Sequence, residues 1–155
     1  MTLLGIDPGK TIGWSLWAET GAELGRGTFD YADIRKHLIL EQYGHVDDAA
    51  LYARFSGLGW YKVNRLVIED YIGRPGQKNG GQRFWGPESL AKIELLGELA
   101  GIEVKRQRAV DVLRTSALHA GYTLPKGHLP DQDAAYLHAR WRLEELGVLR
   151  AVPLD

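Results

Sequence analysis

The beginning of the chain contains three short segments that we predict to be strands, joined by very short connections. The segments are residues 2–6, 12–17 and about 23–29. Asp7-Pro8-Gly9 lies between the first two and Gly21 between the next two, and such residues end a strand and reverse the chain. Because a parallel crossover needs about a dozen residues or more, we predict an antiparallel meander of three strands.

The rest of the chain adds helices and two more strands. Leu66-Val67-Ile68 has the short, wholly apolar pattern of a buried strand. The predicted elements after the meander are a mostly helical segment 31–60 with a break near Gly44 and a new helix start at Asp47-Asp48, the strand 66–68, a helix 87–100, a strand 102–107, a helix 110–120 and a helix 130–147. This order predicts an α/β fold in which a mixed five-stranded sheet carries helices on both faces.

The composition is that of an ordinary globular protein, so we expect a single domain over residues 1–155. Hydrophobic residues make up 45% of the chain and charged residues 25%, both normal for a folded domain. No apolar run is long enough to span a bilayer, and the first residues lack the pattern of a signal peptide. Cysteine is absent, which excludes disulfides and thiolate metal sites. These features predict a cytoplasmic protein without a membrane partner.

Carboxylates follow two of the apolar strands. Asp7 comes directly after the first segment and Glu69 directly after Ile68. A carboxylate beside buried strand residues costs free energy unless it is paired or bound to metal. If the two strands are neighbours, both acids lie at one edge of the sheet, where open α/β sheets place ligands. We therefore predict a site at Asp7 and Glu69. Asp7 could also be a simple turn former, and Asp70 could take the place of Glu69.

The start of the last helix supplies further acids. Asp133, Leu137 and Trp141 fall on one helical stripe, which predicts that Asp133 points inward. Asp131 is about 200° around the helix from Asp133, so it reaches the same site only from before the first turn. We therefore rank Asp133 first and Asp131 second, because Asp131 also suits a helix N-cap. His138, within this helix, is expected to be structural.

The chemistry of these acids indicates the cofactor. Several carboxylates without cysteine suit a hard divalent cation such as Mg²⁺ or Mn²⁺. Two such ions roughly 3.5–4 Å apart can activate water and stabilise the leaving oxygen in phosphodiester hydrolysis. Acids brought together without a cation would repel one another. We therefore predict a nuclease whose two metal ions are held by Asp7, Glu69, Asp133 and Asp131.

The order of these motifs resembles that of RuvC-type Holliday junction resolvases, which belong to the RNase H-like superfamily. The similarity covers nearly the whole chain and rests on Gly5-Ile6-Asp7-Pro8-Gly9, Ile68-Glu69 and Asp133-Ala134. It implies an RNase H-like fold, a homodimer, a four-way DNA junction as substrate and Mg²⁺-dependent nicking of both symmetric strands. The shortness of the chain and the style of its sequence are closer to the phage-encoded branch.

Two positions depart from the family pattern. The family has Asp or His three residues before the last Asp, where this chain has Pro130. Asp131 or His128 could substitute as the fourth ligand. The family also has an aromatic residue just after the strand Glu, at the junction centre, and Tyr71 is nearest to that position. The alternatives in the following loop are Phe84 and Trp85.

Positive charges are unevenly distributed, although the net charge is only −1. The loop 73–87 holds cations and aromatic residues but no acid. Cations bind phosphates and exposed aromatic rings stack on bases, so this loop predicts a nucleic-acid contact. The predicted nucleic-acid-binding residues are Lys10, Tyr71, Arg74, Lys78, Arg83, Phe84, Trp85, Lys105, Arg106, Arg108 and Lys126. A solvated loop at 73–87 and a charged strand edge at 105–108 are the simpler alternatives.

Other functions fit parts of the same pattern. Another nuclease of this fold could act on RNA, RNA–DNA hybrids or flaps. The run Gly5-Ile6-Asp7-x-Gly9 also resembles the first phosphate motif of actin-like ATPases, which normally need two such domains. A non-catalytic DNA binder is a further alternative. A P-loop is excluded, because the glycines are separated by three residues and the Walker pattern needs four.

Overall fold

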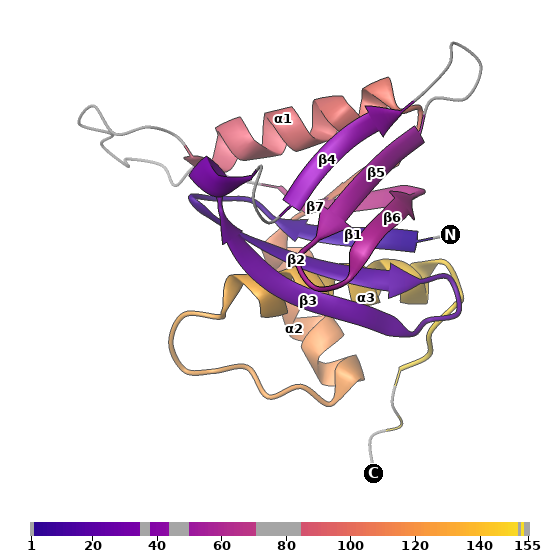
Figure 1. The fold of residues 1–155 in the computed structure, drawn as a ribbon. Coiled ribbons are helices and arrows are strands. Elements are labelled where there is room, and N and C mark those ends of the chain that lie inside the picture. Colours follow the sequence, from indigo (N-terminus) through magenta and orange to yellow (C-terminus); the bar gives the residue numbers. More distant parts are fainter. Residues whose placement is uncertain (1, 35–37, 44–49, 71–84, 152, 154–155) are drawn as a thin grey trace.

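The central feature of the computed structural model is a mixed five-stranded sheet (Figure 1). The structure describes residues 2–34, 38–43, 50–70, 85–151 and 153. The strands of the large sheet lie in the order β3 (Glu23–Asp30), β2 (Thr11–Ala18), β1 (Thr2–Asp7), β7 (Arg65–Glu69) and β8 (Glu103–Gln107). Neighbours among β1, β2 and β3 pair antiparallel, whereas β7 and β8 continue from β1 in parallel. The predicted meander and the five-stranded α/β sheet are confirmed.

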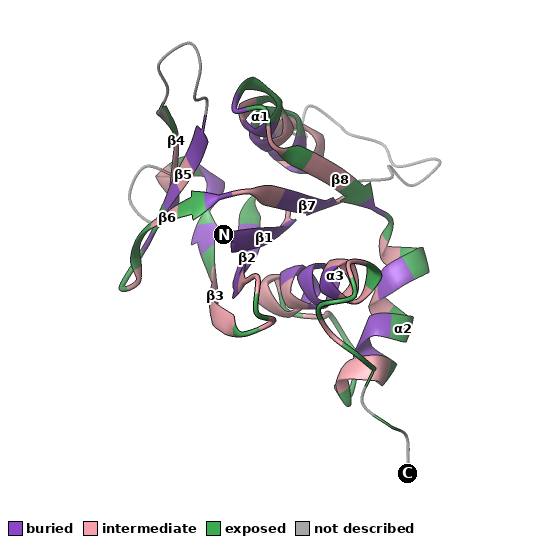
Figure 2. Ribbon diagram, turned by 90° about the vertical axis from the view of Figure 1, so that its right-hand side faces the viewer, coloured by how far each residue is buried: buried purple, intermediate pink, exposed green. Residues whose placement is uncertain are grey.

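Helices cover both faces of this sheet (Figure 2). The helix α3 (Asp131–Glu145) lies on β1 and β2, and α2 (Ala109–Ala120) packs on α3. The helix α1 (Trp85–Leu99) lies on the other face, against β7 and β8. Covering both faces explains why β7 is wholly apolar at its centre, since parallel strands are buried on both sides. None of the helices that the structure describes is long and apolar enough to cross a membrane.

The prediction of a mostly helical segment from 31 to about 60 is wrong. The described residues there form η1 (Tyr31–Asp33), β4 (Leu38–Tyr43), β5 (Ala50–Phe55) and β6 (Gly59–Val63), and the three strands make a separate antiparallel sheet. Alternation explains the strand β5, because Leu51, Ala53 and Phe55 are buried while the residues between them are more exposed. The break expected near Gly44 and the helix start at Asp47-Asp48 lie outside the described residues.

The smaller sheet shares a core with the large one. Phe55 on β5 is 1% exposed, and its ring centroid lies 4.6 Å from that of Trp14 on β2. Leu38 and Val63, from β4 and β6, are buried in the same core together with Ile93 of α1. The smaller sheet and α1 therefore cover the same face of the large sheet, and α3 covers the opposite face.

Phe55→Ala is expected to lower the free energy of unfolding by about 3–5 kcal/mol, because removal of a buried aromatic ring leaves a cavity. Urea unfolding followed by circular dichroism measures this loss. Trp60→Ala on β6 is the control, since that side chain is 45% exposed and its removal should cost less than about 1 kcal/mol. Equal losses in the two variants would contradict the packing of the smaller sheet on the large one.

Candidate active site

Asp7 and Glu69 end neighbouring strands at one edge of the large sheet. The strands β1 and β7 run parallel with Ile6 opposite Ile68, so the next residues, Asp7 and Glu69, lie side by side. Glu69 is in turn opposite Gln107, the last residue of β8. The carboxyl ends of parallel strands form the edge at which α/β sheets bind ligands. The structure therefore brings the first two predicted site residues together.

Two glycines allow α3 to approach this edge closely. Gly13 lies opposite Asp7 in the β1–β2 ladder, and a Cβ at Gly13 would lie 2.0 Å from the backbone oxygen of Asp131. A Cβ at Gly5 would lie 2.5 Å from the backbone oxygen of Ala135. No side chain fits at either distance, so the backbone of α3 rests directly on β1 and β2. Asp131, the first residue of α3, is thereby held beside the strand pair that contains Asp7.

The carboxyl group of Asp7 is strongly perturbed. Burial, followed by the negative charges of Glu69 and Asp131, raises the pKa of Asp7 to about 8. Burial disfavours the charged form of an acid, and nearby like charges add to that effect. Carboxyl groups from β1, β7 and α3 therefore act on one another at this edge. Such strongly shifted acids concentrate at functional sites.

The oxygen donors at this edge suit a divalent cation. Carboxylates are the preferred ligands of Mg²⁺ and Mn²⁺, and a cation would offset the repulsion that raises the pKa of Asp7. In the part of the chain that the structure describes, no three His, Asp or Glu side chains already stand in a ready metal cage. The fit of a divalent cation therefore rests on the chemistry of the oxygen donors and on the repulsion between the neighbouring carboxylates. At neutral pH a cation would have to displace the proton of Asp7.

Asp133, ranked first from the sequence, is engaged in other contacts. Its Oδ1 accepts a hydrogen bond from Arg26 Nη1 at 2.9 Å, and its Oδ2 accepts one from the Tyr122 hydroxyl at 2.8 Å. Arg26 also pairs with Glu23, and its guanidinium lies 3.8 Å from the centre of the Tyr136 ring. Asp133 is half-buried, and its contacts tie α3 to Arg26 on β3 and to Tyr122, two residues after the end of α2.

His138, expected to be only structural, contacts the site directly. Its side chain is fully buried, with Nε2 3.0 Å from Oε2 of Glu69 and Nδ1 2.9 Å from Oε1 of Gln107. His138 follows Asp131 by two helical turns, so the two residues lie on the same side of α3. That spacing, with Ala134 and Ala135 between the two residues on the same side, is the signal that the sequence prediction missed.

Exposed basic side chains lie in the loops around the site. His128 Nε2 is 3.3 Å from Oδ1 of Asp131, in the loop before α3. Lys10 follows the end of β1 and Lys126 precedes α3, and both are exposed. Within the described ranges, neither lysine forms an ion pair. Both are therefore open to an incoming phosphate.

The other predicted nucleic-acid contacts are paired, packed or undescribed. Lys105, Arg106 and Arg108 form ion pairs with Glu145, Glu94 and Asp111, in that order. Trp85 is half-buried and packs edge-on against Tyr31, with ring centroids 5.8 Å apart. The predicted residues that lie outside the described part of the chain are Tyr71, Arg74, Lys78, Arg83 and Phe84.

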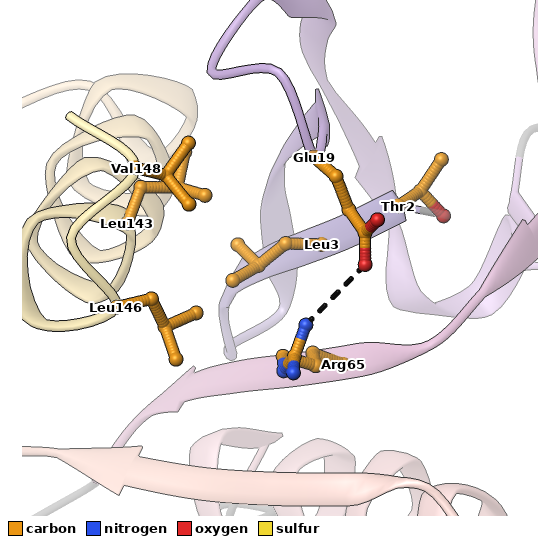
Figure 3. Close-up of a pocket in the computed structure, with 7 residues that line it drawn as sticks. All are labelled: Thr2, Leu3, Glu19, Arg65, Leu143, Leu146 and Val148. Atoms are coloured by element: carbon orange, nitrogen blue, oxygen red, sulfur yellow. Dashed lines mark ion pairs between the residues drawn. The ribbon is translucent and has the colours of Figure 1, made fainter.

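A pocket of about 230 Å³ lies at the opposite end of β1 (Figure 3). Thr2 and Leu3 line it from the start of that strand, and leucines at the end of α3 complete its wall. Arg65 Nη1 lies 3.5 Å from Oε1 of Glu19 within the pocket. Because the pocket is at the amino end of β1 and has mainly apolar walls, it is separate from the edge that carries Asp7.

The strand order, the helices on both faces and the helix-linked parallel strands define an RNase H-like fold of the RuvC type. The structure of T. thermophilus RuvC in complex with a Holliday junction substrate has this fold, with a TM-score of 0.53 and 11% sequence identity over 98% of this chain and 99% of that chain. A second Thermus thermophilus RuvC structure gives a TM-score of 0.44 and 13% identity over 98% of this chain and 100% of that one. No family model and no curated protein matches the sequence.

Proposed function

We propose that the protein is a divalent-metal-dependent endonuclease that nicks four-way DNA junctions and binds metal through Asp7, Glu69 and Asp131. The observation that carries this proposal is that β1, β7 and α3 bring Asp7, Glu69 and Asp131 to one sheet edge, where burial and the other two charges raise the pKa of Asp7. The similarity in fold to a RuvC structure with a Holliday junction substrate supports the choice of substrate. The homodimer, the phage-encoded branch and the cytoplasmic location remain predictions from the sequence.

Asp131 is a better candidate than Asp133 for the last acid of the family motif. With Asp131 in that role, the residue three positions earlier is His128, which fits the Asp or His of the family pattern. His128 already lies 3.3 Å from Asp131. With this assignment the chain no longer departs from the family pattern at Pro130. Asp133 is then a structural residue that binds Arg26.

In the proposed cleavage reaction, some residues of the chain would bind the metal and others would bind the DNA backbone. Bound Mg²⁺ or Mn²⁺ would supply an activated water and stabilise the leaving oxygen. Asp7, Glu69 and Asp131 would bind the cation, and Lys10 and Lys126 would hold the phosphate backbone beside it. Preference for a branched substrate would come from the shape of the DNA rather than from reading of bases.

Cleavage of labelled synthetic DNA in Mg²⁺ tests the proposal. We expect paired, symmetric nicks in a four-way junction and little cutting of a duplex, a flap or an RNA–DNA hybrid. Cutting of the flap or the hybrid instead would agree with metal-dependent cleavage at the carboxylates, but it would contradict the four-way junction as substrate. Absence of cutting in both Mg²⁺ and Mn²⁺ would overturn the nuclease and favour a protein that binds DNA without catalysis.

His138→Leu is expected to weaken Mn²⁺ binding by about 10–100-fold, the usual effect of losing a residue that orients a metal ligand. The reason is that Glu69 loses the ring nitrogen 3.0 Å from its carboxylate. His138→Gln retains an N–H donor and should recover part of the affinity. Calorimetry measures Mn²⁺ binding, and thermal unfolding establishes that each variant folds. Wild-type affinity in a folded His138→Leu protein would make this histidine purely structural.

A further inference from the structure

The outer face of the smaller sheet carries aromatic and cationic side chains that the proposed active site does not use. Leu51, Phe55 and Val63 point into the core, so the alternating residues of β5 and β6 form the outer face. Those residues are Tyr52, Arg54, Trp60 and Lys62, together with Ala50, which is buried. Figures 1 and 2 show no helix or strand of the described chain over this face. Of these residues, Arg54, Trp60 and Lys62 are exposed.

Each cross-strand pair on the outer face joins one aromatic residue to one cation. Arg54 lies opposite Trp60, and Tyr52 lies opposite Lys62. Opposite side chains in such a ladder are roughly 5 Å apart, and residues two apart on one strand are roughly 7 Å apart. The two rings and the two cations therefore alternate within one compact patch.

The cations of this patch are not neutralised by neighbouring acids. Arg54 and Lys62 are exposed and, among the described residues, form no ion pair. Six other arginines of the described chain pair with acids, namely Arg26, Arg65, Arg106, Arg108, Arg140 and Arg142, whereas Arg114 and Arg150 do not. One acid, Glu41 on β4, faces Tyr52 from the other side. Among the described residues of this face, two cations stand against one acid, which gives the patch a positive charge.

We propose that this patch binds a single-stranded nucleic acid, with Trp60 and Tyr52 stacking on bases and Arg54 and Lys62 contacting phosphates. Aromatic rings set among cations hold unpaired strands with little sequence preference. Trp60 is 45% exposed, so part of its ring can contact a base. Bases within a duplex are already stacked on one another, so an unpaired strand is the better partner. This binding surface lies on the smaller sheet and goes beyond the cleavage activity proposed above.

Fluorescence anisotropy with a labelled oligothymidylate of about 20 nucleotides tests the proposal. EDTA prevents cleavage during the measurement. Trp60→Ala should weaken binding roughly five- to 100-fold, the usual effect of losing one base stack, whereas Trp60→Phe should keep most of the affinity. Joint replacement Arg54→Ala and Lys62→Ala should reduce the dependence of log affinity on log salt by about 1.4. Arg114→Ala, at an exposed arginine of α2, is the matched control and should bind as the wild type.

Two results would contradict the proposal that this surface binds a single strand. One is wild-type affinity in the folded Trp60→Ala and Arg54→Ala/Lys62→Ala proteins, and the other is no binding of the oligonucleotide by the wild type. Asp7→Asn separates the surface from the nuclease proposal, because it should stop cleavage and leave oligonucleotide binding unchanged. Binding that depends on Trp60, in a protein that cuts no junction, would support the surface and overturn only the nuclease.

Discussion

Asp7→Asn is expected to reduce the rate of junction cleavage at least about a thousandfold, which corresponds to several kcal/mol of lost transition-state stabilisation. The amide keeps the shape of the side chain and removes the charge that would bind a cation. Single-turnover cleavage in Mg²⁺ measures the effect. Asp111→Asn changes an exposed acid of α2 and should leave the rate unchanged. Wild-type cleavage by the Asp7→Asn protein would contradict a site built on this residue.

The same Asp7→Asn protein is expected to be more stable than the wild type in EDTA, and its advantage should grow with pH. The pKa of Asp7 is raised from 3.8 to about 8 in the fold. Between these values the folded protein keeps a proton that the unfolded chain has released, so wild-type stability falls as the pH rises through this range. Asparagine does not ionise and escapes this loss. Thermal unfolding at about pH 5 and about pH 8 should show the larger difference in Tm at the higher pH.

Asp111 supplies a control of the opposite sign for this experiment. Arg108 lowers the pKa of Asp111, so the ionised carboxylate favours the folded state above its unfolded pKa, and that benefit is lost as the pH falls through the lower folded pKa. Asp111→Asn should therefore gain no stability as the pH rises. A difference in Tm that does not change with pH for Asp7→Asn would contradict the burial and repulsion inferred at the sheet edge.

Asp131→Asn is expected to affect mainly cleavage, and Asp133→Asn is expected to affect mainly stability. Asp131→Asn should reduce cleavage by a factor comparable to that of Asp7→Asn, roughly a thousandfold, with little change in stability. Asp133→Asn should lower the free energy of unfolding by about 1–3 kcal/mol, because it weakens charge-assisted bonds to Arg26 and Tyr122. Its cleavage rate should remain within about tenfold of the wild type.

Urea unfolding and cleavage measured on the same two proteins decide between these acids. Arg26→Ala is a further control, since it removes the partner of Asp133 from β3 without touching Asp131. It should reproduce the loss of stability and spare cleavage. Strong loss of cleavage in Asp133→Asn, together with full cleavage by Asp131→Asn, would restore the ranking that the sequence alone favours.

The large sheet was predictable because its strands are local patterns with clear ends. The turn at Asp7-Pro8-Gly9 and the apolar run before Glu69 each determine one strand without help from the rest of the chain. The smaller sheet was not predictable in this way. Its strand β5 has the sequence Ala-Leu-Tyr-Ala-Arg-Phe, which contains good helix formers, and its strand character depends on packing of Phe55 against Trp14.

The candidate site was predictable in part for a related reason. Asp7 and Glu69 follow strands, so their common edge follows from the sheet alone. The choice between Asp131 and Asp133 depends on how α3 is seated, and Gly13 determines this by admitting the backbone of Asp131. The contact of His138 with Glu69 likewise appears only when α3 is placed on the sheet. Helical periodicity gives a direction for each side chain but not the element that it meets.

Calorimetric titration with Mn²⁺ at about neutral pH tests the central claim, a divalent-metal site at Asp7, Glu69 and Asp131. We predict binding to the wild type with release of protons, because the raised pKa of Asp7 leaves it protonated before the cation enters. Asp133→Asn should bind as the wild type does, and Asp131→Asn should bind at least about tenfold more weakly. Absence of binding by the wild type, or full binding by Asp131→Asn, would contradict the site.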